Sequence, residues 1–267
     1  MSFTDGSYTG KIPEIYDSNL GKLLFVPYAE DVARRAKELN ARRILEIAAG
    51  TGIVTEALAR ALPDATIEAT DLNHAMIDFA SSRRANKGVK WSVADAQQLP
   101  FDDKAFDLVV CQFGAMFFPD RAKAFREARR VLAAGGAYIV SLWEGLQRND
   151  VARIVSDAAR SVFPDDPPLF LERAPYGHGD PVAIERELRA AGFSNVAFER
   201  VEKRTRGSSR SGARGYVEGT PLRFEIEARD ARRLQGVVEA ATEALEKAYG
   251  GSAIDGSMSA LVFTAKR

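Results

Sequence analysis

Residues 43–52 read Arg-Ile-Leu-Glu-Ile-Ala-Ala-Gly-Thr-Gly, and the architecture of the chain can be worked out from this stretch. Its first half is a short apolar run, typical of a buried strand. Gly50 and Gly52 predict a sharp turn, because glycine adopts backbone conformations that other residues avoid. Apolar residues then recur at helical spacing from residue 53 to residue 62, and Pro63 ends the pattern. The stretch therefore predicts a strand that turns directly into a helix.

The alternation of strands and helices continues after this unit. Further strands are predicted at residues 66–70, 89–93, 106–111 and 138–143, with helices around residues 76–80 and 120–132 and a glycine turn at 135–136. Such alternation predicts an α/β fold of the Rossmann-like, doubly wound class, with helices on both faces of a mostly parallel sheet. Ligands of this class bind at the carboxyl ends of the strands.

The remaining segments decorate this core. We expect residues 1–40 to form an N-terminal helical cap, residues 41–206 and 257–267 the core, and residues 207–256 a helical insertion near the C-terminus. Within these segments the pattern predicts helices at 149–163, 180–191 and 234–249, strands at 195–203 and 258–265, and a mobile loop rich in Gly, Ser and Arg at 207–215. An antiparallel late strand would bring the sheet to seven strands.

Composition narrows the functional class. The 267 residues are 46% hydrophobic and 28% charged, which is typical of a folded globular protein. Because 37 basic and 37 acidic residues cancel, the chain lacks the basic surplus usual in proteins that bind long nucleic acids, which disfavours such binding and leaves only a local basic patch as the alternative. The single cysteine, Cys111, excludes an intrachain disulfide and a cysteine-rich metal site. No signal peptide or apolar run of membrane-spanning length is present, so we expect a cytoplasmic protein, either monomer or homodimer.

The glycine turn predicts a particular kind of ligand. The N-terminus of the following helix offers free N–H donors and a positive partial charge, which suit an anion or carboxylate. A dinucleotide fingerprint would need glycine at position 55, where Thr55 stands, and this disfavours a nicotinamide-dependent oxidoreductase. Asp71, 19 residues beyond Gly52, ends the second predicted strand, where a carboxylate can accept from both hydroxyls of a ribose. The two features together indicate a nucleoside-bearing cofactor.

Several short motifs in order give a closer resemblance. They are Leu-Glu-Ile-Ala-Ala-Gly-Thr-Gly at 45–52, Thr-Asp-Leu-Asn at 70–73, Val-Ala-Asp-Ala at 93–96 with Leu-Pro-Phe at 99–101, Phe-Asp-Leu-Val at 106–109 and Arg-Val-Leu-Ala-Ala-Gly-Gly at 130–136, and they cover roughly residues 43–143. By these motifs the chain resembles class I S-adenosylmethionine-dependent methyltransferases, in particular the group typified by ubiquinone/menaquinone C-methyltransferases and small-molecule methyltransferases. The family often has glycine where Ala48 stands here.

The resemblance implies a cofactor, S-adenosyl-L-methionine, with S-adenosyl-L-homocysteine as its product, and a role for each motif. Glu46 would reach the amino group of the cofactor, and Asp71 the ribose hydroxyls. Asp95 would accept from the adenine amino group. The full set of implied cofactor residues is Glu46, Ala48, Gly50, Gly52, Asp71, Leu72, Met76, Asp95, Ala96, Gln112 and Phe113.

The acceptor is less well determined by the sequence. The segment 112–118 lacks the Asn/Asp-Pro-Pro-aromatic sequence with which amino-methylases hold a planar nitrogen, and its apolar, aromatic character favours a small organic acceptor. Candidate pocket residues are Tyr16, Phe25, Met116, Phe117 and Trp143. Methyl transfer needs alignment more than a fixed triad, so a general base is optional; His178, Tyr16 and His74 are candidates that also suit ordinary structural roles. A non-catalytic, cofactor-binding regulatory protein is the alternative function.

Overall fold

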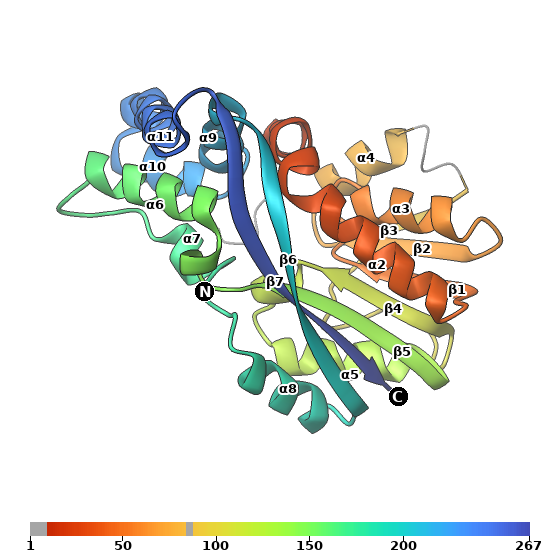
Figure 1. The fold of residues 1–267 in the computed structure, drawn as a ribbon. Coiled ribbons are helices and arrows are strands. Elements are labelled where there is room, and N and C mark those ends of the chain that lie inside the picture. Colours follow the sequence, from red (N-terminus) through yellow and green to blue (C-terminus); the bar gives the residue numbers. More distant parts are fainter. Residues whose placement is uncertain (1–9, 84–87) are drawn as a thin grey trace. The chain divides into compact units, whose positions relative to one another are not determined.

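The computed structural model describes residues 10–83 and 88–267 and contains a seven-stranded sheet (Figure 1). The strand order is β3-β2-β1-β4-β5-β7-β6. The strands are β1 (Arg43–Ile47), β2 (Thr66–Asp71), β3 (Lys90–Val93), β4 (Phe106–Gln112), β5 (Leu132–Trp143), β6 (Ser194–Ser208) and β7 (Ala253–Lys266). Strands β1 to β5 pair in parallel, whereas β7 runs antiparallel to β5. The predicted Rossmann-like class and the antiparallel late strand are confirmed.

Helices join most of the strands. They are α1 (Ile12–Tyr16), the π-helical η1 (Asp17–Phe25), α2 (Val26–Glu38), α3 (Ile53–Ala61), α4 (His74–Ser82), α5 (Arg121–Val131), α6 (Asp150–Val162), α7 (Phe170–Arg173), α8 (Pro181–Ala190), α9 (Ser209–Glu218), α10 (Leu222–Asp230) and α11 (Leu234–Tyr249). Short 3-10 turns lie at η3 (Ala115–Phe117), η4 (Leu146–Arg148) and η5 (Ala231–Arg233). Helices α2 and α3 lie on one face of the sheet, and α5 and α8 on the other (Figure 1). Residues 1–9, where the expected cap begins, and 84–87, where the helix after β2 was expected to end, lie outside the described residues.

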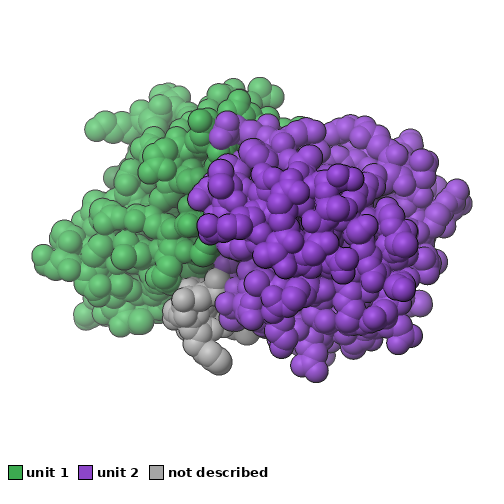
Figure 2. All heavy atoms as spheres, turned by 90° about the horizontal axis from the view of Figure 1, so that it is seen from below, with its two compact units in different colours: residues 1–25, 144–178, 202–259 green, residues 26–143, 179–201, 260–267 purple. Residues whose placement is uncertain are grey.

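The chain divides into two compact units, coloured separately in Figure 2. Unit 2 comprises residues 26–143, 179–201 and 260–267 and contains β1 to β5. Unit 1 comprises the N-terminal segment up to Phe25 with residues 144–178 and 202–259. The segment 10–25 of the expected cap and the expected insertion 207–256 therefore belong to the same unit, while α2 belongs to the other.

The core of unit 2 follows from the sequence pattern. Ala29, Val32, Ala33 and Ala36 recur at helical spacing on α2 and are buried. They join a cluster with Val54, Ala57 and Leu58 of α3 and Ile44 of β1. Alanines at this contact allow the two helices to approach each other closely, since each presents only a methyl group. The packing holds α3, and with it the glycine turn, against the sheet.

The prediction of a mobile loop at residues 207–215 is wrong, because the end of β6 and most of α9 occupy this segment. Strand β6 continues to Ser208, whose hydroxyl accepts from the Ser211 amide at 3.1 Å and so caps α9. The glycines in this segment serve close packing: a Cβ on Gly212 would lie 2.9 Å from Ile254, and one on Gly215 would lie 2.5 Å from Leu20. Sequence alone does not distinguish a glycine that loosens a loop from one that lets a helix approach its neighbour.

The predicted turn at residues 135–136 also differs from the structure. Strand β5 begins at Leu132, and the two glycines form an irregularity within it, where the pairing with β4 shifts register between Phe106 and Leu108. Gly135 has a left-handed φ of 76°. The glycines therefore accommodate a bulge in the strand.

Arg130 of α5 holds residues 99–103, the segment before β4, through several hydrogen bonds. The Arg130 guanidinium donates to the carbonyl oxygens of Leu99 at 3.0 Å and Phe101 at 2.7 Å, and it pairs with Asp103 and Glu127. Because Arg130→Met leaves these acceptors without their donor, we expect it to lower the free energy of unfolding by about 2 kcal/mol.

Chemical denaturation followed by circular dichroism measures this effect. Arg126→Met, on the exposed side of the same helix, is the matched control and should stay within about 0.5 kcal/mol of the parent. Equal losses for the two variants would contradict the assigned role of Arg130.

Candidate active site

The turn after β1 has an unusual backbone. Ala48, Gly50 and Gly52 have φ values of 55°, 56° and 82°, all in the left-handed region, and α3 begins directly afterwards at Ile53. The Ala49 amide donates to the Thr70 carbonyl at 2.9 Å, which ties the turn to β2. Thr51 is buried, and its hydroxyl has no hydrogen-bond partner among the described residues. The turn therefore presents backbone donors and one uncommitted hydroxyl at the N-terminus of a helix.

Asp71 connects the ends of β1 and β2. Its carboxylate accepts from the Gly50 amide at 2.9 Å and from the Asn73 amide at 2.8 Å, and the residue is only 6% exposed. Burial raises the pKa of Asp71, and these backbone donors oppose the rise. The contact with Gly50, which the sequence did not predict, means that this carboxylate also fixes the shape of the turn. Beside it Leu72 is 63% exposed, whereas Met76 is buried.

Glu46 lies in β1 beneath the turn. It is 1% exposed, and its Oε2 accepts from the Thr55 hydroxyl at 2.5 Å. Burial is the main cause that raises the pKa of Glu46 to about 8; the charge of Asp71 also raises it, while the Thr55 hydrogen bond lowers it. Sequence reasoning treated Thr55 only as a missing glycine, and its hydroxyl is a member of the site that was not predicted.

The end of β3 supplies a third carboxylate. Asp95 accepts from the Gln97 amide at 2.8 Å and forms an isolated bridge with Gln98. Ala96 next to it is buried. A hydrogen bond joins the turn at residues 95–98 to the N-terminus of α5, because the Gln97 side-chain carbonyl accepts from the Asp120 amide at 2.8 Å. Asp95 is thus held in a defined turn at the end of its strand.

An aromatic cluster closes the ends of β4 and β5. The Phe113 and Trp143 rings stack with centroids 3.8 Å apart, and the Tyr28 ring meets both edge-on at 5.2 and 5.1 Å. Phe113 has a φ of 56°, a strained value for a non-glycine residue. The Tyr28 hydroxyl donates to the Val201 carbonyl at 3.0 Å. Trp143, which the sequence predicted to line the acceptor pocket, is therefore packed within this buried cluster. Met116, in the loop that follows Phe113, is also buried.

Two loops approach each other closely beside the cluster. A Cβ on Gly114 would lie 2.4 Å from the Ala48 Cβ and 3.0 Å from the Cys111 sulfur. The loop after β4 thus packs directly on the turn after β1. Together with the Gly50–Asp71 contact, this approach brings the predicted residues at the ends of β1, β2 and β4 into one place.

The remaining candidates are distributed over the two units. His74 begins α4 and is exposed, with its Nδ1 2.7 Å from Asp78 Oδ2. Phe117 is half-buried in η3. Tyr16 and Phe25 stack with centroids 4.7 Å apart in unit 1, and His178, half-buried, also belongs to unit 1.

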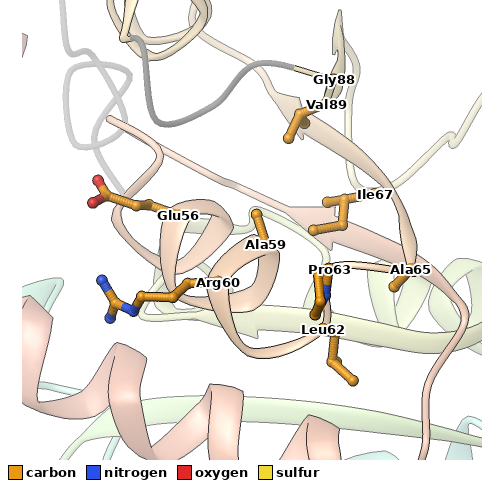
Figure 3. Close-up of a pocket in the computed structure, with 9 residues that line it drawn as sticks. All are labelled: Glu56, Ala59, Arg60, Leu62, Pro63, Ala65, Ile67, Gly88 and Val89. Atoms are coloured by element: carbon orange, nitrogen blue, oxygen red, sulfur yellow. The ribbon is translucent and has the colours of Figure 1, made fainter.

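Two hollows lie at the amino ends of the strands, opposite the ends that carry the glycine turn and Asp71. One of about 430 Å³ is lined by Glu56, Ala59, Arg60, Leu62, Pro63, Ala65, Ile67, Gly88 and Val89 (Figure 3). A second, of about 290 Å³, includes Arg43, Thr66 and Phe106, which begin β1, β2 and β4. Both lie at the amino ends of the strands, so neither coincides with the site built above.

A doubly wound sheet with a glycine turn after β1 and a carboxylate at the end of β2 is the arrangement of a Rossmann-like domain that binds a nucleoside cofactor. Residues 45–140 match the family model described as "Methyltransferase domain". The chain is 33% identical over 167 residues to the ubiquinone/menaquinone biosynthesis C-methyltransferase UbiE of Cupriavidus taiwanensis, covering 58% of this chain and 69% of that protein. It is 37% identical over 103 residues to the demethylmenaquinone methyltransferase of Thermotoga maritima, covering 39% and 44%.

Solved structures agree on the fold. YcgJ of Bacillus subtilis superposes with a TM-score of 0.57 at 19% identity, covering 90% of this chain and 98% of that chain. The cyclase SpnF superposes with a TM-score of 0.58 at 23% identity, covering 91% and 80%. The chain belongs to the class I S-adenosylmethionine-dependent methyltransferases of the UbiE-like type. It is an enzyme that uses S-adenosylmethionine as its cofactor. None of the helices in the described residues combines the length and apolar character needed to cross a membrane.

Proposed function

We propose that this enzyme transfers the methyl group of S-adenosylmethionine to a small organic acceptor. The observation that carries the proposal is the buried aromatic cluster of Tyr28, Phe113 and Trp143 at the ends of β4 and β5. These rings are buried and pack on one another, so in our proposal they form the backing of the acceptor pocket, and an apolar backing suits an acceptor with an apolar or aromatic body. The zero net charge supports a small molecule over a nucleic acid, and the relatives named above carry names from quinone biosynthesis.

The residues at the strand ends fit the cofactor. When bound, it supplies a methyl group on a positively charged sulfur. In our proposal Glu46 holds its amino group, and Asp71 holds the ribose hydroxyls with the acceptor sites that Gly50 and Asn73 leave open. The uncommitted Thr51 hydroxyl and the backbone of residues 48–52 suit its carboxylate.

The adenine and the methionine chain have proposed neighbours of their own. Asp95 and the Ala96 backbone would read the adenine edge, and Leu72 and Met76 would contact its face. Gln112 and Phe113 would border the methionine portion, since Gln112 ends β4 and Phe113 follows it, at the carboxyl ends of the strands. The exposed Leu72 side chain supports this assignment, because adenine would cover apolar surface there.

The chain needs to align the acceptor and exclude water. An in-line displacement on a strong electrophile gains much of its rate from alignment, so no fixed triad is required. Tyr16, His178 and His74 stay candidates for a base when the acceptor is a phenol or a protonated amine. We also propose that unit 1, which holds residues 10–25 of the expected cap and the 207–256 insertion, selects the acceptor.

A turnover screen tests the proposed function. The enzyme is incubated with S-adenosylmethionine and a panel of phenols, amines and quinone precursors, and S-adenosylhomocysteine is quantified by mass spectrometry. We expect methylation of at least one aromatic acceptor. Tyr16→Phe, His178→Gln and His74→Gln test the three candidate bases, and Asp64→Asn, which changes an exposed side chain of unit 2, is the control. Tight binding of S-adenosylhomocysteine without turnover on any panel member would overturn the proposal and favour a regulatory cofactor-binding protein.

A further inference from the structure

Two buried side chains beneath the glycine turn form a polar pair. Glu46 on β1 and Thr55 on α3 are both almost completely buried, and the Thr55 hydroxyl donates to Glu46 Oε2 at 2.5 Å. Valine has nearly the shape of threonine and would fill position 55 without a polar atom. A buried hydroxyl bonded to a buried carboxyl therefore indicates a carboxyl that must keep one orientation.

Glu46 has another acidic group near it, and within the described residues no cationic side chain forms an ion pair with it. From β2 the carboxylate of Asp71 faces it and raises its pKa, and from β4 the Cys111 thiol is nearby, itself kept neutral because burial raises its pKa to about 12. With a pKa of about 8, Glu46 is mostly a neutral acid at pH 7 before a ligand binds.

We propose that Thr55 is a positioning residue for cofactor binding and that the Glu46–Thr55 pair releases one proton to the solvent when the ammonium group of the cofactor binds. The inference rests on the proposed contact between Glu46 and the cofactor amino group. The acid O–H bond breaks, the proton goes to the buffer, and the carboxylate that forms is neutralised by the ammonium group. Throughout, the Thr55 hydroxyl donates to Oε2 and leaves Oε1 for the ligand.

The proposal fixes the sign of a pH dependence. Because binding releases a proton, a higher pH favours binding. The association constant should rise about tenfold per pH unit below the pKa of Glu46 and level off near pH 8. The α-amino group of the ligand lies beside a free carboxylate and stays protonated at neutral pH, so the measurement uses the window from pH 5.5 to 7.5, where only the enzyme group changes its protonation.

Calorimetry counts the proton directly. Binding of S-adenosylhomocysteine is measured at pH 6.5 in two buffers with different ionisation enthalpies. We expect release of close to one proton for the parent enzyme and none for Glu46→Gln. 5′-Methylthioadenosine, which lacks the amino acid portion, should bind without proton release. A proton still released by Glu46→Gln would identify Asp71 or another group as its source and overturn the proposal.

Substitution of Thr55 tests the positioning role. Thr55→Val should weaken S-adenosylhomocysteine binding about tenfold at pH 7, the usual size of one hydrogen bond to a charged group, and should move the plateau of affinity to higher pH. Thr55→Ser keeps the hydroxyl and should restore the parent profile. These binding measurements do not depend on the acceptor, so they are separate from any failure of the turnover screen.

Thr70 offers a matched control for the loss of a buried hydroxyl. Its Oγ1 donates to the backbone carbonyl of the same Glu46 at 3.1 Å, and the residue is equally buried. Thr70→Val should therefore lower the melting temperature by an amount similar to Thr55→Val but leave the pH profile unchanged. An unchanged profile in Thr55→Val, or equal shifts in both variants, would show that Thr55 is merely structural.

Discussion

Replacing Asp71 by alanine should weaken S-adenosylhomocysteine binding by about 100-fold. Two charge-assisted hydrogen bonds to a ribose contribute about 3 kcal/mol, and every 1.4 kcal/mol corresponds to a factor of ten. The substitution also removes the acceptor for the Gly50 amide, so the glycine turn loses its tie to the end of β2. Titration calorimetry measures the affinity, and the melting temperature reports the effect on the fold.

Two further variants separate these effects. Asp71→Asn retains an oxygen that can accept from the Gly50 amide but loses the negative charge, so it should preserve most of the stability and still bind at least tenfold more weakly. Asp78→Ala removes an exposed carboxylate on the neighbouring helix α4 and should bind like the parent. If folded Asp71→Ala bound within threefold of the parent, Asp71 would not hold the ribose.

Gly114→Ala should lower the free energy of unfolding by about 2–3 kcal/mol, the upper part of the range for an overpacked core. The new Cβ would lie 2.4 Å from the Ala48 Cβ, and the loop after β4 could avoid it only by moving away from the glycine turn. We therefore also expect weaker cofactor binding. Thermal and urea denaturation measure the first effect, and calorimetry with S-adenosylhomocysteine measures the second.

The contact can be relieved from its other side. Ala48→Gly removes the methyl group that the new Cβ would meet, and the left-handed φ of 55° at position 48 suits glycine. The double variant should regain at least half of the lost stability. Gly236→Ala, in α11 with open space around its Cβ position, is the control and should stabilise by up to about 1 kcal/mol. Additive losses in the double variant would show that the two loops do not press on each other.

The sequence predicted what depends on local pattern. Strand β1, the turn at Gly50 and Gly52, and helix α3 were predicted close to their observed limits, because a buried strand, a glycine pair and helical periodicity are each visible in a few residues. The position of Asp71 at the end of β2 was also predictable, because its spacing of 19 residues from Gly52 places it after one helix and one strand.

What sequence reasoning missed depends on partners far along the chain. Gly212 and Gly215 look like loop glycines until Ile254 and Leu20 are seen against them. Thr55 looks like a missing glycine until Glu46 is seen to accept its hydrogen bond. The stacking of Phe113 on Trp143 joins two residues that pattern alone would assign separately to a cofactor site and an acceptor pocket.

The way the chain is divided constrains how acceptor choice could be re-engineered. The chain passes between unit 1 and unit 2 five times, at residues 25/26, 143/144, 178/179, 201/202 and 259/260. Grafting residues 207–256 alone onto a relative would separate Gly215 from Leu20 and Tyr216 from Tyr176, whose hydroxyls lie 2.7 Å apart. A transplant of specificity therefore has to move all three segments of unit 1 together, and recombination between homologues at a single breakpoint would produce a chimaera whose two halves do not match.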